Sequence, residues 1–258
     1  VSRVFKKPHI VLDDTEHAKF ELMMYPPFSD VILNPKPFWK AFSKKQLFFD
    51  SYMEMSHLLP KYFTANAEII ESYGLNENEK YFIVRFVSWD ASHDVGQTGL
   101  DLSTKRSIVK ILEKHGRVLI SSESKLPAEL EKYKIKINPA HLHHLLYFSA
   151  MYIGEGATTA AEAIILGTPA IYINTLDAGT ISEQAAKYGL VSLRNAKDIM
   201  VKIDEFLSPQ AKADAIEMRN KLINDKIDIT SFLVWFVENY PESEKIMREN
   251  PDYQYNFK

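Results

Sequence analysis

The chain has 258 residues, of which 46% are hydrophobic and 25% are charged, and its formal net charge at pH 7 is -3. These values are typical of a globular protein with one large or two ordinary domains. The balanced charge gives no reason to expect nucleic acid or an anionic membrane as a partner. The absence of cysteine excludes disulfides, thiolate metal ligands and a cysteine nucleophile. With no apolar run of transmembrane length, this composition predicts a cytoplasmic location.

The first part of the chain predicts a partial α/β unit. Short apolar segments at 9–12, 29–33 and 46–49 predict strands, and residues 18–24 have helical character with Asp14 or Thr15 as the cap. These elements are too few to close a sheet of their own. We therefore expect a partial N-terminal domain over residues 1–62, followed by a linker over residues 63–79.

From residue 80 the chain alternates regularly between strands and helices. Strands are predicted at 81–87, 117–121, 151–153, 170–173 and 190–193, with helices at 104–115, 127–133, 140–150, 158–166, 182–188 and 196–206. The alternation predicts a Rossmann-like, doubly wound parallel sheet over residues 80–227, which would bind ligands at the carboxyl ends of its strands. Helices at 209–225 and 230–240 follow, so residues 228–258 are expected to form a C-terminal helix and an aromatic polar tail.

The stretch Met151–Pro169 carries the strongest ligand-binding signal. It predicts a buried strand, a tight turn at Gly154 and Gly156, and a helix. Glycine takes backbone angles closed to other residues and lets a ligand approach the main chain. The amide groups of the helix N-terminus would then favour a phosphate through hydrogen bonds and the helix dipole.

Three polar residues follow this turn: Thr158, Thr159 and Glu162. Thr158 and Glu162 are four residues apart, so they share one helix face and point toward the helix N-terminus. A hydroxyl near a phosphate and a carboxylate one turn deeper suit a sugar-nucleotide, with Glu162 accepting hydrogen bonds from ribose hydroxyls. The alternative is a plain strand-turn-helix with a threonine cap and an exposed glutamate.

Other candidate residues lie where further strands end. Asp14, within the acidic segment 13–17, can serve as a base, a metal ligand or a sugar-hydroxyl acceptor, or simply as a helix cap. Arg85 lies inside an apolar strand and needs a carboxylate or a bound phosphate as its partner. His93, in the next loop, can protonate a leaving group or cap the loop. Glu183 is either a second sugar-hydroxyl ligand or a carboxylate at a helix start.

Histidines at 141, 143 and 144 raise the question of a metal site. His141 and His144 share one helix face, whereas His143 points elsewhere. Zinc would need a further ligand, so we expect no metal site. The chain also lacks the glycine-rich dinucleotide fingerprint, the phosphate-loop motif and the serine-hydrolase elbow, which argues against those three enzyme classes.

The block Gly154–Pro169 resembles the C-terminal nucleotide-sugar motif of GT-B-fold proteins. With the segment 13–18, Arg85-Phe86 and residues 91–94, the chain resembles an uncharacterised GT-B-like family related to non-hydrolysing UDP-N-acetylglucosamine 2-epimerases. The resemblance implies that Glu162 binds ribose and that Gly156, Thr158 and Thr159 hold phosphate. It further implies that Arg85 and His93 face the diphosphate or sugar, and that Asp14 lies near the transferred sugar.

The resemblance also has departures. The epimerases carry paired glutamates where this chain has Ala161-Glu162, and a His-Arg pair where it has Trp89-Asp90. GT-B proteins begin with a whole Rossmann domain, whereas residues 1–59 match its second half. We therefore expect this chain to be a fragment, a processed form or a truncated gene product.

These residues together favour a metal-independent, GT-B-type glycosyltransferase that acts in surface-polysaccharide or glycan synthesis. The expected donor is a nucleotide-sugar, most simply a UDP-sugar, with no further cofactor and with an unknown acceptor. Arg85 would neutralise the diphosphate, and His93 or Asp14 would act as acid or base. The alternatives are a UDP-sugar 2-epimerase and a nucleotide-sugar-binding protein without catalysis.

Overall fold

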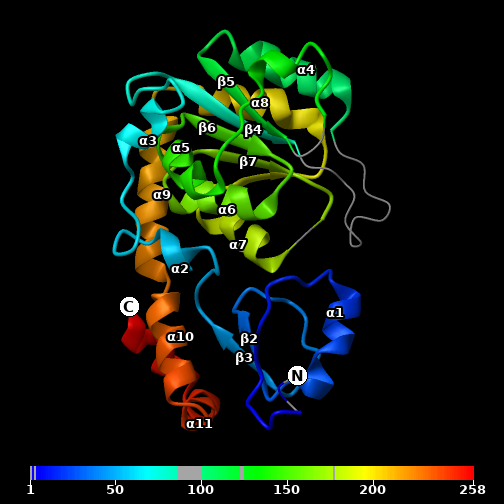
Figure 1. Cartoon of the computed structure of the whole chain (residues 1–258), viewed down its shortest axis with the longest axis vertical. Helices are drawn as coiled ribbons and strands as arrows, with labels where there is room; N and C mark the ends of the chain where they lie inside the picture. The colour runs from blue at the N-terminus through cyan, green and yellow to red at the C-terminus, as the bar shows by residue number, and fades with distance from the viewer. Residues whose placement is uncertain (1, 3, 87–99, 123–124, 177) are drawn as a thin grey trace.

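The computed structural model describes residues 2, 4–86, 100–122, 125–176 and 178–258. In this part of the chain the strands form two separate parallel sheets, one of three strands and one of five. Figure 1 shows the small sheet near the N-terminus and the large sheet, which is built from the middle of the chain.

The small sheet has the strand order β1-β2-β3. Its elements are β1 (Ile10–Leu12), α1 (Lys19–Met24), η1 (Pro26–Phe28), β2 (Val31–Pro35), β3 (Gln46–Phe49) and α2 (Met55–Leu58). The central strand β2 is buried at every position, because it has a neighbouring strand on both sides and covered faces.

The predicted capping of the first helix by Asp14 or Thr15 is wrong. α1 begins at Lys19, its N-cap is Ala18, and no described side chain caps it. A tight turn precedes the helix, in which the Ala18 amide donates to the Thr15 carbonyl at 3.2 Å and the Lys19 amide donates to the His17 carbonyl at 2.8 Å. This turn moves the helix start away from Asp14 and leaves Asp14 beside the carboxyl end of β1.

The large sheet has the order β5-β4-β6-β7-β8, and all of its described strand pairs are parallel. Its strands are β4 (Tyr81–Phe86), β5 (Arg117–Ser122), β6 (Met151–Gly154), β7 (Ala170–Ile173) and β8 (Val191–Leu193). The predicted Rossmann-like, doubly wound parallel sheet is thus confirmed.

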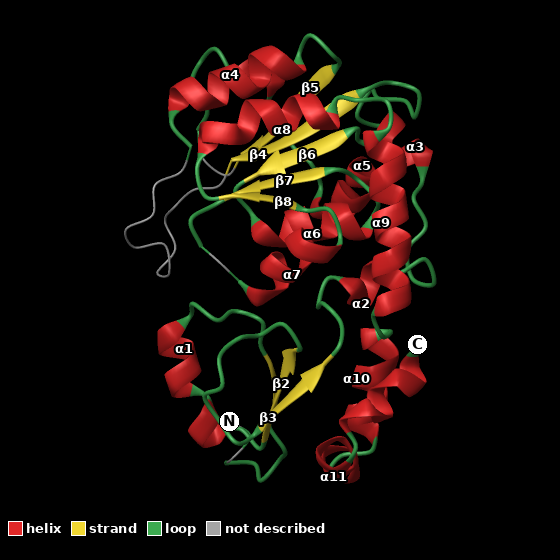
Figure 2. Cartoon of the chain, turned by 180° about the vertical axis from the view of Figure 1, so that it is seen from behind, coloured by secondary structure: helices red, strands yellow, loops and turns green. Residues whose placement is uncertain are grey.

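Helices cover both faces of the large sheet, as Figures 1 and 2 show. One face carries α4 (Leu102–Leu112), η4 (Ala196–Asp198) and α8 (Ile199–Phe206); the other carries α5 (Leu142–Phe148), α6 (Ala157–Ile165), α7 (Gly179–Lys187) and α9 (Ala211–Asp225). Phe82 and Val84 pack toward the first layer, Tyr81 and Ile83 toward the second, because successive side chains of a strand point to opposite faces.

Short elements connect these layers: α3 (Ala67–Glu71), η2 (Glu131–Tyr133) and η3 (Pro139–His141). The helix predicted at 127–133 is reduced to the single turn η2. Leu126 and Leu130, which precede η2, are buried against the face that carries α4, so this segment packs as a turn and not as a longer helix.

The end of the chain returns to the small sheet. α10 (Ile229–Glu238) is followed by α11 (Glu242–Glu249) and η5 (Pro251–Phe257), so the segment predicted as a tail is helical. α9, α10 and α11 run along one side of the molecule past both sheets (Figure 1).

Aromatic packing and hydrogen bonds hold this C-terminal segment in place. The Phe49 and Phe232 ring centroids lie 6.3 Å apart, and the Trp235 and Tyr253 rings stack at 4.8 Å. The Asp50 amide donates to Gln254 Oε1 at 2.6 Å. Residues of both sheets therefore belong to one continuous apolar core. Within the described residues, no helix combines the length and apolarity that crossing a membrane requires.

Candidate functional site

The strand order of the large sheet has a topological switch point at β4 and β6. The chain leaves β4 toward β5 on one side and continues with β6 on the other side. At such a switch point the crossovers diverge, and a crevice opens at the carboxyl ends of the two strands. Arg85 pairs in register with Gly154 there, and the Glu155 amide donates to the Arg85 carbonyl at 3.3 Å. The fold thus brings the predicted arginine and glycine turn together.

Gly154 is required for space, whereas neither glycine of the turn has an unusual backbone angle. A Cβ on Gly154 would lie 2.3 Å from Tyr152 Oη and 3.0 Å from the Arg85 carbonyl oxygen. Gly156 has a φ of -93°, which any residue adopts. The expectation of special backbone angles is therefore wrong. The approach of a ligand to the main chain of this turn stays a prediction.

The turn leads into the N-terminus of α6. The N-cap is Gly156, and among the described side chains none caps this end. The Ala160 amide donates to the Gly156 carbonyl at 3.2 Å, so the amides of the three preceding residues lack an intrahelical acceptor. Such amides, together with the positive end of the helix dipole, favour an anion at this helix end.

The two threonines of this turn differ in their surroundings. Thr158 is exposed at the helix N-terminus, where its hydroxyl is free to reach an anion. Thr159 is buried. Burial raises the pKa of the Tyr152 phenol, and a hydrogen bond from the Thr159 hydroxyl opposes that shift. Thr159 can therefore offer a phosphate its backbone amide, whereas its hydroxyl is directed at Tyr152.

Arg85 supplies the positive charge beside this turn. Its side chain is half-buried. Its Nε lies 3.8 Å from the position that a Cβ on Gly156 would take. The guanidinium therefore runs along the glycine turn, next to the uncapped end of α6. A planar guanidinium in this position suits a diphosphate, which it can contact through two parallel hydrogen bonds.

Glu162 lies one turn deeper in α6 and is 8% exposed. Its Oε1 is 3.1 Å from His143 Nε2 of α5. The structure thus turns His143 toward Glu162, whereas the sequence predicted that His141 and His144 share one helix face and that His143 points elsewhere. The spacing of the histidines did not predict which of them faces Glu162, because residues 139–141 form the turn η3 and the helix α5 begins only at Leu142.

The segments that follow strands of the small sheet contribute carboxylates to the candidate site. Asp14 is half-buried and its Oδ1 accepts a hydrogen bond from the Thr15 hydroxyl at 3.2 Å. Burial raises the pKa of Asp14; the Thr15 hydrogen bond opposes this shift and the charge of Asp13 adds to it. Asp13 is held by hydrogen bonds from the Tyr25 hydroxyl and by a contact of Asn34 Nδ2 with its carbonyl at 2.6 Å.

Glu54 is a site residue that the sequence analysis did not single out. It precedes α2, in the segment after β3, and is half-buried. Burial raises its pKa to about 7, and the negative charges of Asp14 and Glu162 add to this shift. Glu54 therefore lies close enough to Asp14, after β1, and to Glu162, in α6, for their charges to affect its ionisation. Glu54 could have been found in the sequence as a polar residue that follows a predicted strand, as Asp14 was.

Glu16 holds the segment that follows β1 against the large sheet. Its side chain is fully buried and Oε1 accepts a hydrogen bond from the Gly179 amide, the first residue of α7, at 2.9 Å. A Cβ on Gly179 would lie 1.7 Å from the Pro37 carbonyl oxygen, so the two backbones touch here. This contact positions Asp14 on the same side as the glycine turn.

Glu183 lies in a separate ion-pair cluster. Its carboxylate accepts hydrogen bonds from Tyr52 Oη at 2.6 Å and from the Nζ atoms of Lys187 and Lys226 at 2.8 Å each. Burial alone would raise the pKa of Glu183, but these hydrogen bonds hold it below its usual value. This arrangement favours a structural role, and we leave Glu183 out of the proposed nucleotide contacts.

His93, the predicted acid or base, lies outside the described residues. It belongs to the segment 87–99, which follows β4 directly. Its assignment therefore stays a prediction.

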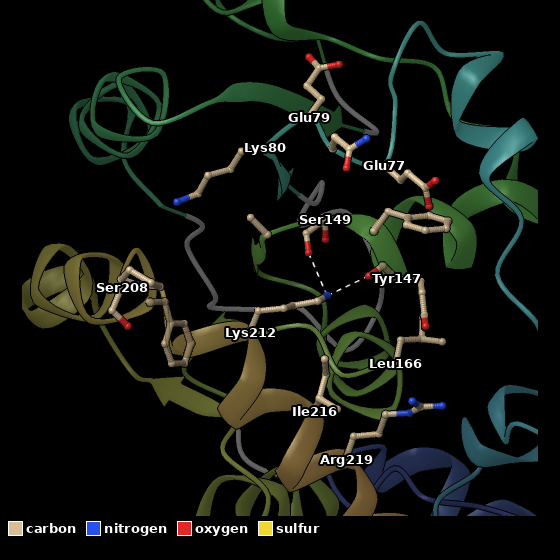
Figure 3. A pocket seen from close by; sticks show the side chains of 15 residues that line it. Glu77, Glu79, Lys80, Tyr147, Ser149, Leu166, Ser208, Lys212, Ile216 and Arg219 are labelled. Atoms are coloured by element: carbon tan, nitrogen blue, oxygen red, sulfur yellow. Dashed lines mark hydrogen bonds between the residues drawn. The ribbon is translucent and has the colours of Figure 1, made fainter.

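A separate cavity of about 500 Å³ lies at the opposite end of the large sheet. Its lining includes Lys80 and Ala150, which precede β4 and β6, so it opens at the amino ends of the strands. Figure 3 shows Lys212 in this cavity. Its Nζ donates to the carbonyls of Tyr147 at 2.8 Å and Ser149 at 3.1 Å. Lys212 thus satisfies carbonyl groups at the end of α5, a structural role.

Comparison with known families identifies the group to which the chain is similar. A family model described as "Protein of unknown function (DUF354)" matches residues 2–230. A search of curated proteins gave no match.

Solved structures resemble the whole chain. S. aureus MnaA in complex with UDP is 10% identical with a TM-score of 0.59, covering 94% of this chain and 72% of that chain. A protein from Listeria monocytogenes assigned as a UDP-N-acetylglucosamine 2-epimerase is 11% identical with a TM-score of 0.59, covering 93% and 70%. The spinosyn rhamnosyltransferase SpnG with thymidine diphosphate is 13% identical with a TM-score of 0.55, covering 92% and 69%.

At these identities the likeness establishes the fold alone. The chain has the GT-B fold, and the predicted resemblance to an uncharacterised GT-B-like family is confirmed.

Proposed function

The chain belongs to the DUF354 family of proteins of unknown function, and we propose that it binds a nucleotide-sugar and transfers the sugar to an acceptor. One observation carries this proposal. At the switch point of the large sheet, the N-terminus of α6 has no cap from a described side chain. Arg85 lies beside this helix end, and the Glu162 carboxylate lies one turn deeper in the helix.

The diphosphate and the ribose of a nucleotide each have a matching group in this arrangement. The α6 amides, Thr158 and Arg85 supply donors and positive charge for the diphosphate. Glu162 supplies an acceptor for the ribose hydroxyls. It lies farther along α6, as expected for a ribose that is attached to the phosphates. The similar structures with UDP and thymidine diphosphate support a diphosphate ligand for this fold.

The sugar end of the donor would face the small sheet. Asp14 and Glu54 offer carboxyl groups there, and the pKa of Glu54, about 7, lets it take or give a proton near neutral pH. We assign Glu54 or Asp14 as the base that removes the acceptor hydroxyl proton, with His93 as the other candidate from the sequence.

The transfer then needs no group beyond these residues. The acceptor oxygen forms a bond to the anomeric carbon while the bond from that carbon to the diphosphate oxygen breaks. The diphosphate leaves with the electron pair, and the acceptor proton goes to the base. Arg85 and the α6 amides stabilise the charge that develops on the leaving diphosphate.

A 2-epimerase is the second candidate, and a specific observation favours it. The Listeria protein assigned as a UDP-N-acetylglucosamine 2-epimerase has one of the higher TM-scores, and Glu54 is a carboxyl group suited to proton exchange. The two reactions are separable, since an epimerase incorporates solvent deuterium at sugar C2 without an acceptor. A protein that binds UDP but shows neither transfer, hydrolysis nor exchange would be a binding protein without catalysis.

The central test is calorimetric titration of UDP and UDP-sugars into the wild type and Glu162→Ala. We expect the substitution to weaken binding about tenfold or more, because a hydrogen bond to a charged group contributes about 1.5–3 kcal/mol. Glu217→Ala, an exposed position on α9, is the matched control and should bind as the wild type does. Equal affinity in wild type and Glu162→Ala would refute the proposal.

The nucleotide base is identified by a thermal-shift screen across UDP-, GDP-, CMP- and dTDP-sugars. A ligand that binds the native state raises its stability with the logarithm of ligand concentration over the dissociation constant. We expect the UDP series to give the largest shift. No shift with any nucleotide-sugar would contradict the assignment of the turn as a nucleotide site.

A further inference from the structure

Three helices bring two histidines and a glutamate to one point. His57 comes from α2, His143 from α5 and Glu162 from α6. Their ligand atoms all lie within 4.8 Å of one another, and His143 Nε2 is 3.1 Å from Glu162 Oε1. These residues are far apart in the sequence, so the cluster exists only in the folded chain.

The composition of this cluster matches a known coordination chemistry. Two imidazoles and one carboxylate bind first-row divalent cations, and three protein ligands with water at the fourth position are usual for zinc. With bonds of about 2.0–2.1 Å, two ligand atoms of a tetrahedral zinc lie about 3.3 Å apart. The His143–Glu162 separation is close to this spacing. His57 is exposed on a short helix, so its ring can serve as the third ligand.

We propose that His57, His143 and Glu162 form a binding site for a first-row divalent cation of the Zn²⁺ class. This goes beyond the proposed function, because cation binding requires no nucleotide. Glu162 belongs to both proposals, however. A carboxylate that coordinates a cation no longer accepts hydrogen bonds from ribose, so the cation and the nucleotide should compete.

The surroundings of the cluster support metal coordination. Ser56 Oγ lies 3.3 Å from His57 Nδ1, which leaves His57 Nε2 as the coordinating atom. The His57 and His143 ring centroids are 5.0 Å apart, and the Phe63 ring packs edge-on against His143 at 6.1 Å. Hydrogen bonds to the second nitrogen and an apolar wall are the features that orient metal-binding histidines.

The neighbouring histidines are engaged elsewhere. His144 Nδ1 accepts a hydrogen bond from the Asn66 amide at 3.0 Å, and His141 Nδ1 lies 3.0 Å from Tyr73 Oη. These contacts anchor η3 and α5 to the segment around α3. His144 is a suitable control, since it lies next to His143 in the sequence but is outside the cluster.

The test uses tag-free protein, stripped with a chelator and titrated with Co²⁺ in the absence of nucleotide. We expect a visible absorption band of a four- or five-coordinate site, which stoichiometric Zn²⁺ abolishes. His57→Gln and His143→Gln should each weaken Co²⁺ binding at least tenfold, whereas His144→Gln should bind as the wild type does. His57 is exposed, so its variant should fold even if His143→Gln does not. Absence of the band, or unchanged affinity in His57→Gln, would overturn the proposal.

A second titration adds UDP to the Co²⁺-loaded protein. We expect UDP to raise the apparent dissociation constant of Co²⁺ in proportion to its concentration. A Co²⁺ band in a protein that fails to bind UDP would support the cation site and refute the nucleotide proposal. Independent binding of both ligands would refute the shared use of Glu162.

Discussion

Glu54 has the most perturbed ionisation among the carboxyl groups of the proposed site. Its pKa is raised to about 7, first by burial and then by the charges of Asp14 and Glu162. An ordinary glutamate titrates near pH 4.3. Between these two pH values Glu54 is protonated in the folded protein but ionised in the unfolded chain. The free energy of unfolding therefore falls as the pH rises through this window.

The substitution Glu54→Gln removes this pH dependence. Above pH 7 the wild type carries the cost of an ionised, poorly solvated carboxylate, and the variant does not. We expect Glu54→Gln to be more stable than the wild type at pH 8, by on the order of 1–3 kcal/mol, and similar to it at pH 4. Urea denaturation at both pH values measures the difference.

A matched control separates this effect from a general loss of charge. Glu217→Gln alters an exposed glutamate on α9 and should leave the pH profile of the wild type unchanged. If the stability curves of wild type and Glu54→Gln ran parallel from pH 4 to pH 8, the raised pKa of Glu54 would be wrong.

At the scale of the elements, the helix α10 packs the end of the chain against the small sheet. Its residues Ile229, Phe232 and Phe236 are buried. Asp228 is its N-cap, and Oδ1 accepts hydrogen bonds from the amides of Thr230 and Ser231 at 3.1 Å each. An N-cap of this kind satisfies amide groups that otherwise have no acceptor in the helix.

We expect Asp228→Ala to lower the free energy of unfolding by about 1–2 kcal/mol, because the substitution removes this cap. Asp228→Asn keeps an oxygen for the same amides and should cost less. Urea denaturation at pH 7 measures both. Equal losses in the two variants would show that charge, and not capping, is what Asp228 contributes.

Asp228 should also make the stability of the protein depend on pH in acid. Burial opposes ionisation of Asp228, but hydrogen bonds from Lys61 and Ser231 dominate and lower its pKa to about 2. Since the folded pKa lies below the ordinary value, the stabilisation is present above about pH 4. It is lost as the pH falls toward 2, and this loss should be absent in Asp228→Ala.

At the scale of the whole molecule, Lys226 connects the two sheets. It is 4% exposed. Its Nζ donates at 2.8 Å both to Asp50, directly after β3, and to Glu183 of α7. The same ammonium lies 4.9 Å from the centroid of the Tyr52 ring. A buried cation that pairs with carboxylates beside both sheets therefore helps to fix their relative position.

We expect Lys226→Met to destabilise the protein by about 3–5 kcal/mol, because removing one partner of a buried ion pair leaves the other charges uncompensated. Lys221→Met is the control. Lys221 pairs with Asp225 at the surface, and exposed pairs contribute about 0–1 kcal/mol. Denaturation of both variants at pH 7 measures the difference, and similar midpoints would contradict a central role for Lys226.

Much of the architecture was predictable because its signals are local. Apolar strands that alternate with amphipathic helices from residue 80 onward predict a parallel sheet, and this sheet is present. In such a sheet all carboxyl ends lie at one edge. The sequence therefore also predicted that Arg85, Gly154 and Glu162 would lie near one another, since each has a known offset from a strand end.

Contacts between distant segments carry no such local signal. Glu54 and His57 belong to α2 and its N-cap, whereas His143 belongs to α5. The Lys226 cluster joins residues 50, 52, 183 and 226. The C-terminal helices are ordered by rings that meet only after the chain returns to the small sheet. Apolar periodicity predicts which face of an element is buried, but not against which partner. Desolvation and pairing of charges depend on that partner. The raised pKa of Glu54 and the cluster of His57, His143 and Glu162 therefore arise only in the tertiary structure.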